Sequence, residues 1–199
     1  MVKGVQRRRR KSSDRKLTPV PPQDTPPQDT LPEAPDFLTA FNAASRKDAE
    51  AMLRPCADIP RWCNEVAAAR PFATAGELLS FAELAAPDFT ETEIDAALAR
   101  HPRIGDRPEG SGTEASLSCT EQESVTGLEH VQDRLHAGNR AYEDRFGRVF
   151  LIRAAGRSAE DILTVLEERL QHTDTEEIPV IAAQLRDIAI LRLEGLLST

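Results

Sequence analysis

Apolar residues recur every three or four positions along most of the chain from Asp36 onward, which is the period of an amphipathic α-helix. Five short helices are predicted between Asp36 and about residue 100, and each ends near a proline or a glycine. Their apolar positions are Phe37, Leu38 and Phe41; Ala49, Met52 and Leu53; Trp62, Cys63, Val66 and Ala67; Leu78, Leu79 and Leu84; and Ile94, Ala97 and Leu98.

The starts of these helices also carry sequence signals. Asp36 can accept hydrogen bonds from the free amides of a first turn, and Pro60 suits a first helical position because it has no N–H to satisfy. Thr74 and Thr90 are each followed three residues later by a glutamate, which is the spacing of a capping box. The helical prediction therefore rests on end signals as well as on periodicity.

The second half of the chain begins with residues 101–117, whose prolines and glycines predict a long loop of the kind that often carries function. Ser118 opens the longest predicted helix, which runs to Gly147, and the following run 149–152 is too short to classify by its period. Ser158 caps the next helix, and a last helix covers about Thr175 to Leu197. No alternating pattern indicates a set of strands, so the predicted fold class is all-α, a single compact multi-helix domain.

Residues 1–35 differ from the rest in composition. Residues 1–16 hold eight Lys and Arg against one acid, and the pentapeptide Pro-Pro-Gln-Asp-Thr then occurs twice, at 21–25 and 26–30. Blocks of like charge are usually solvated, and dense proline favours an extended conformation. We therefore predict a disordered, basic and Pro-rich arm over residues 1–35 and one folded domain over 36–199. An anionic partner or an SH3-type domain remains open as a ligand of the arm.

Charge and cysteine content exclude several classes of protein. The chain carries −8, and because residues 1–16 carry +7, the remainder carries −15 and repels a polyphosphate, so nucleic acid is not an expected partner. No run approaches the ~18 apolar residues of a membrane span, and the amino terminus lacks the apolar core of a secretory signal. The three cysteines form no C-x-x-C pair, which argues against a disulfide framework or a metal site and favours the cytoplasm.

His101 is the first candidate for chemistry. It follows a predicted helix and precedes Pro102, whose ring biases His101 away from helical geometry and can hold the imidazole in one direction. One interpretation is a cationic side chain at a helix carboxyl end. The other is a proton-transfer group that faces a pocket. The other histidines, His130, His136 and His172, lie among charged neighbours and are expected to be exposed or to cap helix ends.

Two further segments are candidates for binding. Ser118 and Glu121 have the spacing of a capping box, but Gln122 has no role in such a box, and the free amides of a helix amino terminus also suit an anionic ligand. Gly147 indicates a helix end, after which the run from Phe150 returns to the core, where its backbone could line a pocket. A Ser-His-Asp hydrolase is not predicted, because the chain lacks a Gly-x-Ser-x-Gly elbow.

Several motifs occur in a characteristic order. His-Pro-Arg-Ile-Gly at 101–105 is followed by Ser-x-x-Glu-Gln at 118–122, by Tyr-Glu-x-Arg-Phe-Gly-x-x-Phe-Leu-Ile-x-Ala at 142–154, by Glu-Arg-Leu at 168–170 and by Leu-Arg-Leu at 191–193. From Asp36 to Leu197 the chain therefore resembles the 2-oxo-4-hydroxy-4-carboxy-5-ureidoimidazoline (OHCU) decarboxylase family. The resemblance implies an all-α, often homodimeric enzyme that needs no cofactor and converts OHCU to (S)-allantoin in urate and purine degradation.

By the same resemblance, His101 corresponds to the family's catalytic histidine and Glu121 to its essential carboxylate. The positions that correspond to substrate-binding residues are Pro102, Ser118, Cys119, Thr120, Gln122, Phe150, Leu151, Ile152, Arg153, Ala154 and Arg192. Residues 1–35 lie outside the family pattern, and the ending Leu-Leu-Ser-Thr is not the peroxisomal tripeptide of animal members, which implies a cytoplasmic enzyme. Two other functions remain open: a non-catalytic helical scaffold or adaptor that uses the arm, and an enzyme that acts on a related small ureide acid.

Overall fold

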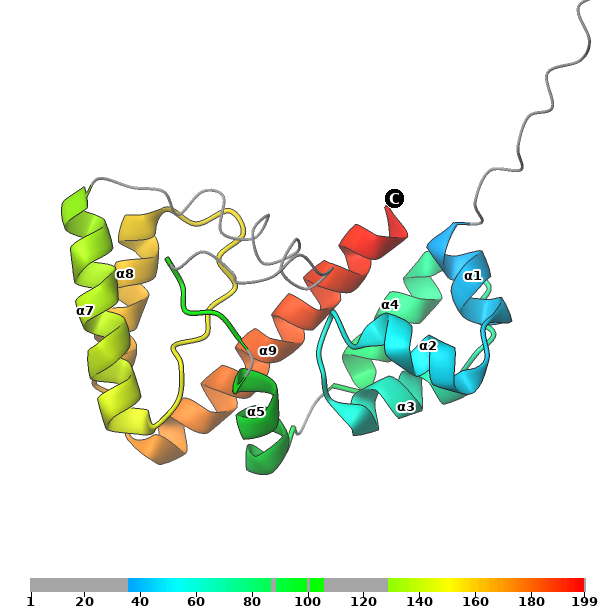
Figure 1. Cartoon of the computed structure of the whole chain (residues 1–199), viewed down its shortest axis with the longest axis horizontal. Coiled ribbons are helices and arrows are strands. Elements are labelled where there is room, and N and C mark those ends of the chain that lie inside the picture. Colours follow the sequence, from blue (N-terminus) through cyan, green and yellow to red (C-terminus); the bar gives the residue numbers. More distant parts are fainter. Residues whose placement is uncertain (1–35, 87–88, 100, 106–128, 199) are drawn as a thin grey trace, which may run out of the picture. The chain divides into compact units, whose positions relative to one another are not determined.

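The computed structural model describes residues 36–86, 89–99, 101–105 and 129–198, and within these ranges the ordered elements are helices, with no strand (Figure 1). The all-α prediction is confirmed. The helices are α1 (Phe37–Ala43), α2 (Arg46–Leu53), α3 (Pro60–Ala68), α4 (Ala75–Leu84), α5 (Glu91–Leu98), α7 (Glu129–Phe146), α8 (Ala159–Arg169) and α9 (Asp174–Leu197). The predicted arm and the predicted start of a helix at Ser118 lie outside the described residues.

Most of the predicted end signals act as expected. The Asp36 carboxylate accepts the Thr39 N–H at 2.9 Å, and Pro60 occupies the first position of α3. Complete capping boxes begin α5, at Thr90, and α8, at Ser158. Thr74 differs: it accepts the Glu77 N–H, but the Glu77 carboxylate takes the N–H of Ala73 rather than that of Thr74. The helix start is nevertheless satisfied, because the reciprocal bond has moved back by one residue.

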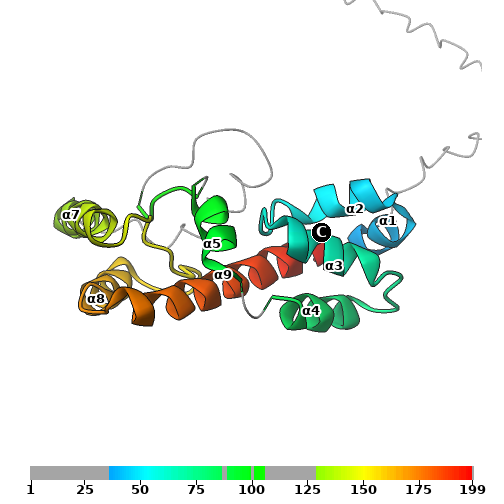
Figure 2. The ribbon, with the colours of Figure 1, turned by 90° about the horizontal axis from the view of Figure 1, so that it is seen from below.

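Apolar side chains of the described residues form two core clusters. The first surrounds Trp62, whose indole N–H donates to the Ala82 carbonyl at 2.9 Å, and it joins α1–α5 to the carboxyl-terminal two thirds of α9. The second lies between α7 and α8 and includes Leu135, Tyr142 and Leu166. Helix α9 extends from the α7–α8 pair to the helices of the first cluster (Figures 1 and 2). It therefore connects the two cores.

Residues 150–154 run between the clusters without regular secondary structure. The side chains of Phe150, Ile152 and Ala154 belong to the second cluster, Leu151 belongs to the first, and Arg153 is exposed. This alternation is that of an extended backbone, in which successive side chains point to opposite sides. The unclassified apolar run at 149–152 is thus an extended connection that is anchored on both cores.

No helix of the described part is long and apolar enough to cross a membrane.

Candidate active site

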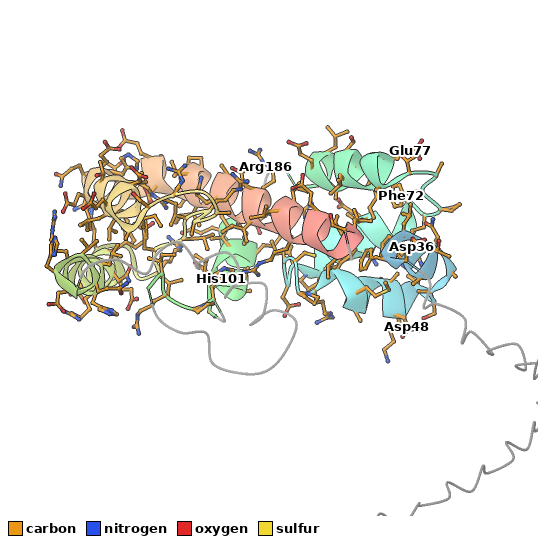
Figure 3. All side chains as sticks on the ribbon, turned by 90° about the horizontal axis from the view of Figure 1, so that it is seen from above. Asp36, Asp48, Phe72, Glu77, His101 and Arg186 are labelled. Carbon is orange, nitrogen blue, oxygen red and sulfur yellow. The ribbon has the colours of Figure 1, made fainter. Side chains whose placement is uncertain are left out.

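His101 lies two residues beyond the end cap of α5, at the edge of the first core cluster (Figure 3). Its backbone N–H donates to the Leu98 carbonyl at 3.0 Å, which closes the last turn of α5. Pro102 follows, and both side chains are partly buried. The helix end and the proline therefore fix the backbone on either side of the imidazole.

Arg192 reaches His101 from α9. Its side chain is buried, its Nη1 donates to the Pro55 carbonyl at 3.2 Å, and its Nη2 lies 3.5 Å from Nε2 of His101. A guanidinium can only donate hydrogen bonds, so the imidazole nitrogen that faces it must be the acceptor. In the neutral ring this contact favours the tautomer that carries its proton on Nδ1. The structure brings together two predicted site residues that are 91 positions apart in the sequence.

The surroundings of His101 disfavour its charged form. Burial, reinforced by the positive charge of Arg192, lowers the pKa of His101 from 6.5 to about 3. The imidazole is therefore neutral at physiological pH and does not supply the positive charge that the helix-capping interpretation requires. A partly buried, neutral imidazole is suited to accept a proton from a bound ligand.

Polar contacts from α7 hold the short loop that follows His101. Asn139 is buried and donates through Nδ2 to the Ile104 carbonyl at 2.9 Å. Arg103 forms a two-pronged ion pair with Glu143 at 2.5 and 2.7 Å, and this hydrogen bonding lowers the pKa of the Glu143 carboxyl. Both contacts tie residues 103–104 to α7, so the backbone after His101 and Pro102 is anchored on the second core.

The backbone of the predicted binding segment 150–154 is held at two points. The Leu151 carbonyl accepts a hydrogen bond from Nη1 of Arg169 at 2.7 Å, and the Arg153 N–H donates to Oε1 of Gln184 on α9 at 2.9 Å. Extended backbone offers unpaired N–H and C=O groups that must find partners when buried. In this segment, side chains from α8 and α9 provide two of those partners.

Sequence patterns did not predict the buried polar cluster behind this segment. Glu177 and Arg169 are 1% and 3% exposed, and the guanidinium donates to Oε1 of Glu177 from Nε at 2.8 Å and from Nη2 at 2.5 Å. The Tyr142 hydroxyl donates to the same oxygen, and burial raises the pKa of this hydroxyl. His172, expected to be exposed or to cap a helix, instead donates from Nδ1 to Oε2 of Glu177 at 2.6 Å. The sequence feature that could have indicated this cluster is the family motif Glu-Arg-Leu at 168–170, which contains Arg169.

The remaining predicted site residues, Ser118, Cys119, Thr120, Glu121 and Gln122, lie outside the described residues. Among the residues that are described, no group of three or more His, Cys, Asp and Glu side chains is placed to hold a metal ion. Three cavities lined by described residues lie along α3, α4 and α9, and their walls do not include His101, Arg192 or residues 150–154. The arrangement at His101 thus combines one neutral proton acceptor and one buried cation, flanked by anchored backbone.

Comparison with known proteins identifies the sequence family. The family model for OHCU decarboxylase matches residues 42–194. An OHCU decarboxylase of Haloferax volcanii is 28% identical over 66% of this chain and 79% of its own length. The uric acid degradation bifunctional protein of Arabidopsis thaliana is 32% identical over 51% of this chain and 33% of its own, and an OHCU decarboxylase of Halalkalicoccus jeotgali is 28% identical over 50% and 56%.

Two solved structures share the fold. A crystal structure of an OHCU decarboxylase, determined in the presence of (S)-allantoin, superposes with a TM-score of 0.63 at 22% identity and covers 78% of this chain and 100% of the other. A crystal structure of an (S)-allantoin synthase superposes with a TM-score of 0.59 at 16% identity and covers 81% of this chain and 54% of the other. Because the family model matches more than half of the sequence, the chain belongs to the OHCU decarboxylase family, a family of carboxy-lyases.

Proposed function

We propose that the chain decarboxylates OHCU to (S)-allantoin in urate degradation. The observation that carries the proposal is the pairing of His101 with the buried Arg192, in a chain whose residues 42–194 match the family model. This pair places a proton acceptor beside a fixed positive charge, which suits an anionic substrate that must lose a carboxylate and gain a proton.

The reaction breaks the bond between the carboxylate and a ring carbon. The electron pair of that bond remains on the ring and is delocalised into an enolate, CO2 leaves, and one proton must reach one face of a ring carbon to give the S product. Because the ring itself accepts the electron pair, the proposed reaction needs no separate electron sink such as an organic cofactor. The protein must bind the anion, orient the carboxylate and direct the proton.

We assign the proton transfer to His101. The neutral ring accepts the substrate's hydroxyl proton while CO2 leaves, and the imidazolium then returns this proton to the carbon face that it covers. Solvent supplies the one further proton that makes the product neutral. Substrate binding favours this role, because a negative charge close to His101 and Arg192 raises the pKa of the imidazole above its value in the empty site. Glu121, which lies outside the described residues, is the proposed carboxylate partner of the Nδ1–H group.

Substrate binding is assigned to four parts of the chain. Arg192 pairs with an anionic oxygen of the substrate, since a guanidinium presents several donors in one plane. Backbone groups of Phe150–Ala154 bind the ring and ureido amides, together with Pro102 and the segment Ser118–Gln122. The anchoring of residues 151 and 153 by side chains of α8 and α9 supports a binding role for this backbone, because fixed groups lose little entropy on binding.

A turnover assay tests the proposal. Freshly generated OHCU is mixed with the full chain, and the circular-dichroism signal of (S)-allantoin is followed against spontaneous decay. We expect the protein to accelerate the signal and to give the S form in excess. A folded protein that leaves both the rate and the handedness unchanged refutes the assignment. A panel of related ureide acids distinguishes the second enzymatic candidate, and inactivity on the whole panel favours the scaffold alternative.

The association state and the location are part of the same proposal. We infer a homodimer and a cytoplasmic enzyme, with residues 1–35 as an arm outside the catalytic domain 36–199. Light scattering of the full chain at several concentrations tests the homodimer, and a monomer at all concentrations contradicts it.

A further inference from the structure

We propose that Arg169 is a positioning residue for the reaction: it holds the Leu151 carbonyl from the core side, so that the segment Phe150–Ala154 keeps the backbone geometry that binds the substrate. The inference rests on the proposed function, because it takes Phe150–Ala154 to be the substrate-binding segment. It assigns a role to a buried cluster that takes no part in the proposed proton transfer. Within the described part of the chain, the hydrogen bonds of Arg169 go to Glu177, Tyr142 and the Leu151 carbonyl.

The guanidinium of Arg169 divides its donors between two tasks. Nε and Nη2 bind Oε1 of Glu177, and Nη2 also lies 3.2 Å from the Tyr142 hydroxyl. Nη1 points the other way and donates to the Leu151 carbonyl at 2.7 Å. The guanidinium carbon lies 4.7 Å from the centre of the Phe150 ring. One side chain therefore contacts both the backbone and the first aromatic ring of the segment.

The rest of the cluster keeps Arg169 in this orientation. Glu177 forms an ion pair with Arg169, and the Glu177 carboxylate also accepts hydrogen bonds from the Tyr142 hydroxyl at Oε1 and from His172 Nδ1 at Oε2. The guanidinium plane is therefore fixed by groups from α7, from α9 and from the turn between α8 and α9. A planar fork with separate donors can satisfy a carboxylate and a carbonyl at once, whereas a lysine ammonium is a single point. The geometry thus depends on arginine in particular.

A second contact from α9 supports the same purpose. Gln184 accepts the Arg153 N–H, and Glu177, Gln184 and Arg192 are separated by seven and eight residues, which places them on one face of the helix. That face meets the Arg169 cluster, the binding segment and His101 in succession. Helix α9 therefore sets the spacing between the anchored segment and the proposed catalytic pair.

The opposing interpretation is that the cluster only stabilises the second core. Arg169→Lys separates the two, since it keeps a positive charge opposite Glu177 but removes the separate arm to Leu151. We expect KM for OHCU to rise roughly tenfold, kcat to change by less than about threefold, and the pH profile of kcat to stay as in the wild type. We also expect the Arg153 amide to exchange with solvent roughly tenfold faster by NMR.

Leu78→Ala, in the first core cluster, is the matched control, because it removes apolar packing and leaves Arg169 and Gln184, the partners of the Leu151 carbonyl and the Arg153 N–H, unchanged. If Arg169→Lys lowers the melting temperature as Leu78→Ala does, with KM and the Arg153 amide exchange equal to those of the control, the positioning role is overturned. Should the wild type fail to turn over OHCU, the proposed function fails, and the amide exchange alone then decides whether Arg169 anchors the segment.

A double variant covers the case in which Arg169→Lys does not fold. Arg169→Met combined with Glu177→Leu removes both charges together, so no unpaired buried charge remains. We expect this variant to fold and to show the same rise in KM and the same faster exchange of the Arg153 amide. Wild-type KM and wild-type exchange in the folded double variant would overturn the proposal.

Discussion

At the scale of single residues, two arrangements of charge characterise the site. Arg192 disfavours the protonated form of His101, and Glu177 forms an ion pair with Arg169. The His101 imidazole lies 3.5 Å from a guanidinium and is largely withdrawn from water, so its protonation is suppressed. Arg169, by contrast, is buried against the carboxylate of Glu177. The two buried arginines therefore have different neighbours: Arg192 lies beside His101 and disfavours its protonation, whereas Arg169 pairs with Glu177 within the core.

The depressed pKa of His101 predicts an effect of acid on stability. The unfolded chain binds a proton at this histidine below about pH 6.5, whereas the folded chain does so only near pH 3, so the free energy of unfolding falls as the pH drops through this window. His101→Gln removes this contribution. Urea unfolding measures the free energy of unfolding at pH 7 and at pH 4. We expect the decrease between these two pH values to be smaller in the variant than in the wild type by about 1–3 kcal/mol.

His130→Gln serves as the control for that experiment, because His130 is exposed on α7. We expect it to lose as much stability as the wild type on acidification. Equal losses in the wild type, His101→Gln and His130→Gln would mean that His101 titrates normally in the folded chain.

The proposed role of Arg192 predicts that its removal weakens substrate binding more than it slows the chemical step. Arg192→Met keeps most of the apolar side chain but removes the cation and the bond to the Pro55 carbonyl. We expect KM to rise about 10–100-fold, which is the range for the loss of a charge-assisted hydrogen bond, with a smaller change in kcat. Steady-state kinetics at pH 7 measure both constants. A loss confined to kcat, with KM unchanged, contradicts the binding role.

Residue-scale features differ in how well the sequence predicts them. His101 and Pro102 are adjacent, so the sequence alone shows that the ring is constrained. The proximity of His101 and Arg192 is a long-range contact that no local pattern encodes, and only the resemblance to a family indicated Arg192. The pairing of Arg169 with Glu177 was missed because charged residues near helix ends usually face solvent, and burial is decided by the packing of three helices.

At the scale of elements, the position of the site depends on how closely helices pack as well as on where their caps begin them. Gly138 faces α8, and a Cβ at this position lies 2.5 Å from Cδ2 and 3.2 Å from Cγ of Leu166, which is fully buried. The missing side chain lets α7 and α8 approach, and these two helices carry Asn139, Tyr142 and Arg169. The spacing of the pair therefore affects the anchors of both the loop after His101 and the binding segment.

Gly138→Ala tests this packing. The added methyl group requires Leu166 to move within a filled core, and this cost exceeds the gain of alanine in helix propensity. We expect a net loss of about 1–2 kcal/mol in the free energy of unfolding, measured by urea denaturation. Gly76→Ala on α4 is the matched control, because its nearest neighbour lies at 3.8 Å, and we expect it to be neutral or slightly stabilising. A loss of equal size in both variants would contradict the packing argument.

Element boundaries followed from local chemistry wherever the cap was local. Thr90 and Ser158 start α5 and α8 as predicted, because a capping box involves only one turn of chain. Helix α9 begins at Asp174, one residue before the prediction, since the box at Thr173 and Glu176 had not been recognised. The run at 149–152 could not be classified, because its extended form depends on two separate cores rather than on its own period.

At the scale of the whole molecule, α9 organises the described part of the chain. It contributes apolar side chains to the first core, Glu177 to the cluster behind the second, and Arg192 to the pair with His101. The all-α class was predictable, because helical periodicity and caps are local properties. The division into two cores joined by one helix was not, because it depends on which apolar faces meet.

The central claim is that His101 transfers a proton during the decarboxylation of OHCU, and one comparison of rates tests it most directly. The formation of (S)-allantoin from freshly generated OHCU is measured for the wild type, His101→Gln and His130→Gln, after circular dichroism has shown that all three are folded. We expect the wild type and His130→Gln to accelerate the reaction equally, and His101→Gln to be slower by about 10²–10⁴-fold, as is typical when a general acid–base group is removed. A wild-type rate in folded His101→Gln would contradict the claim.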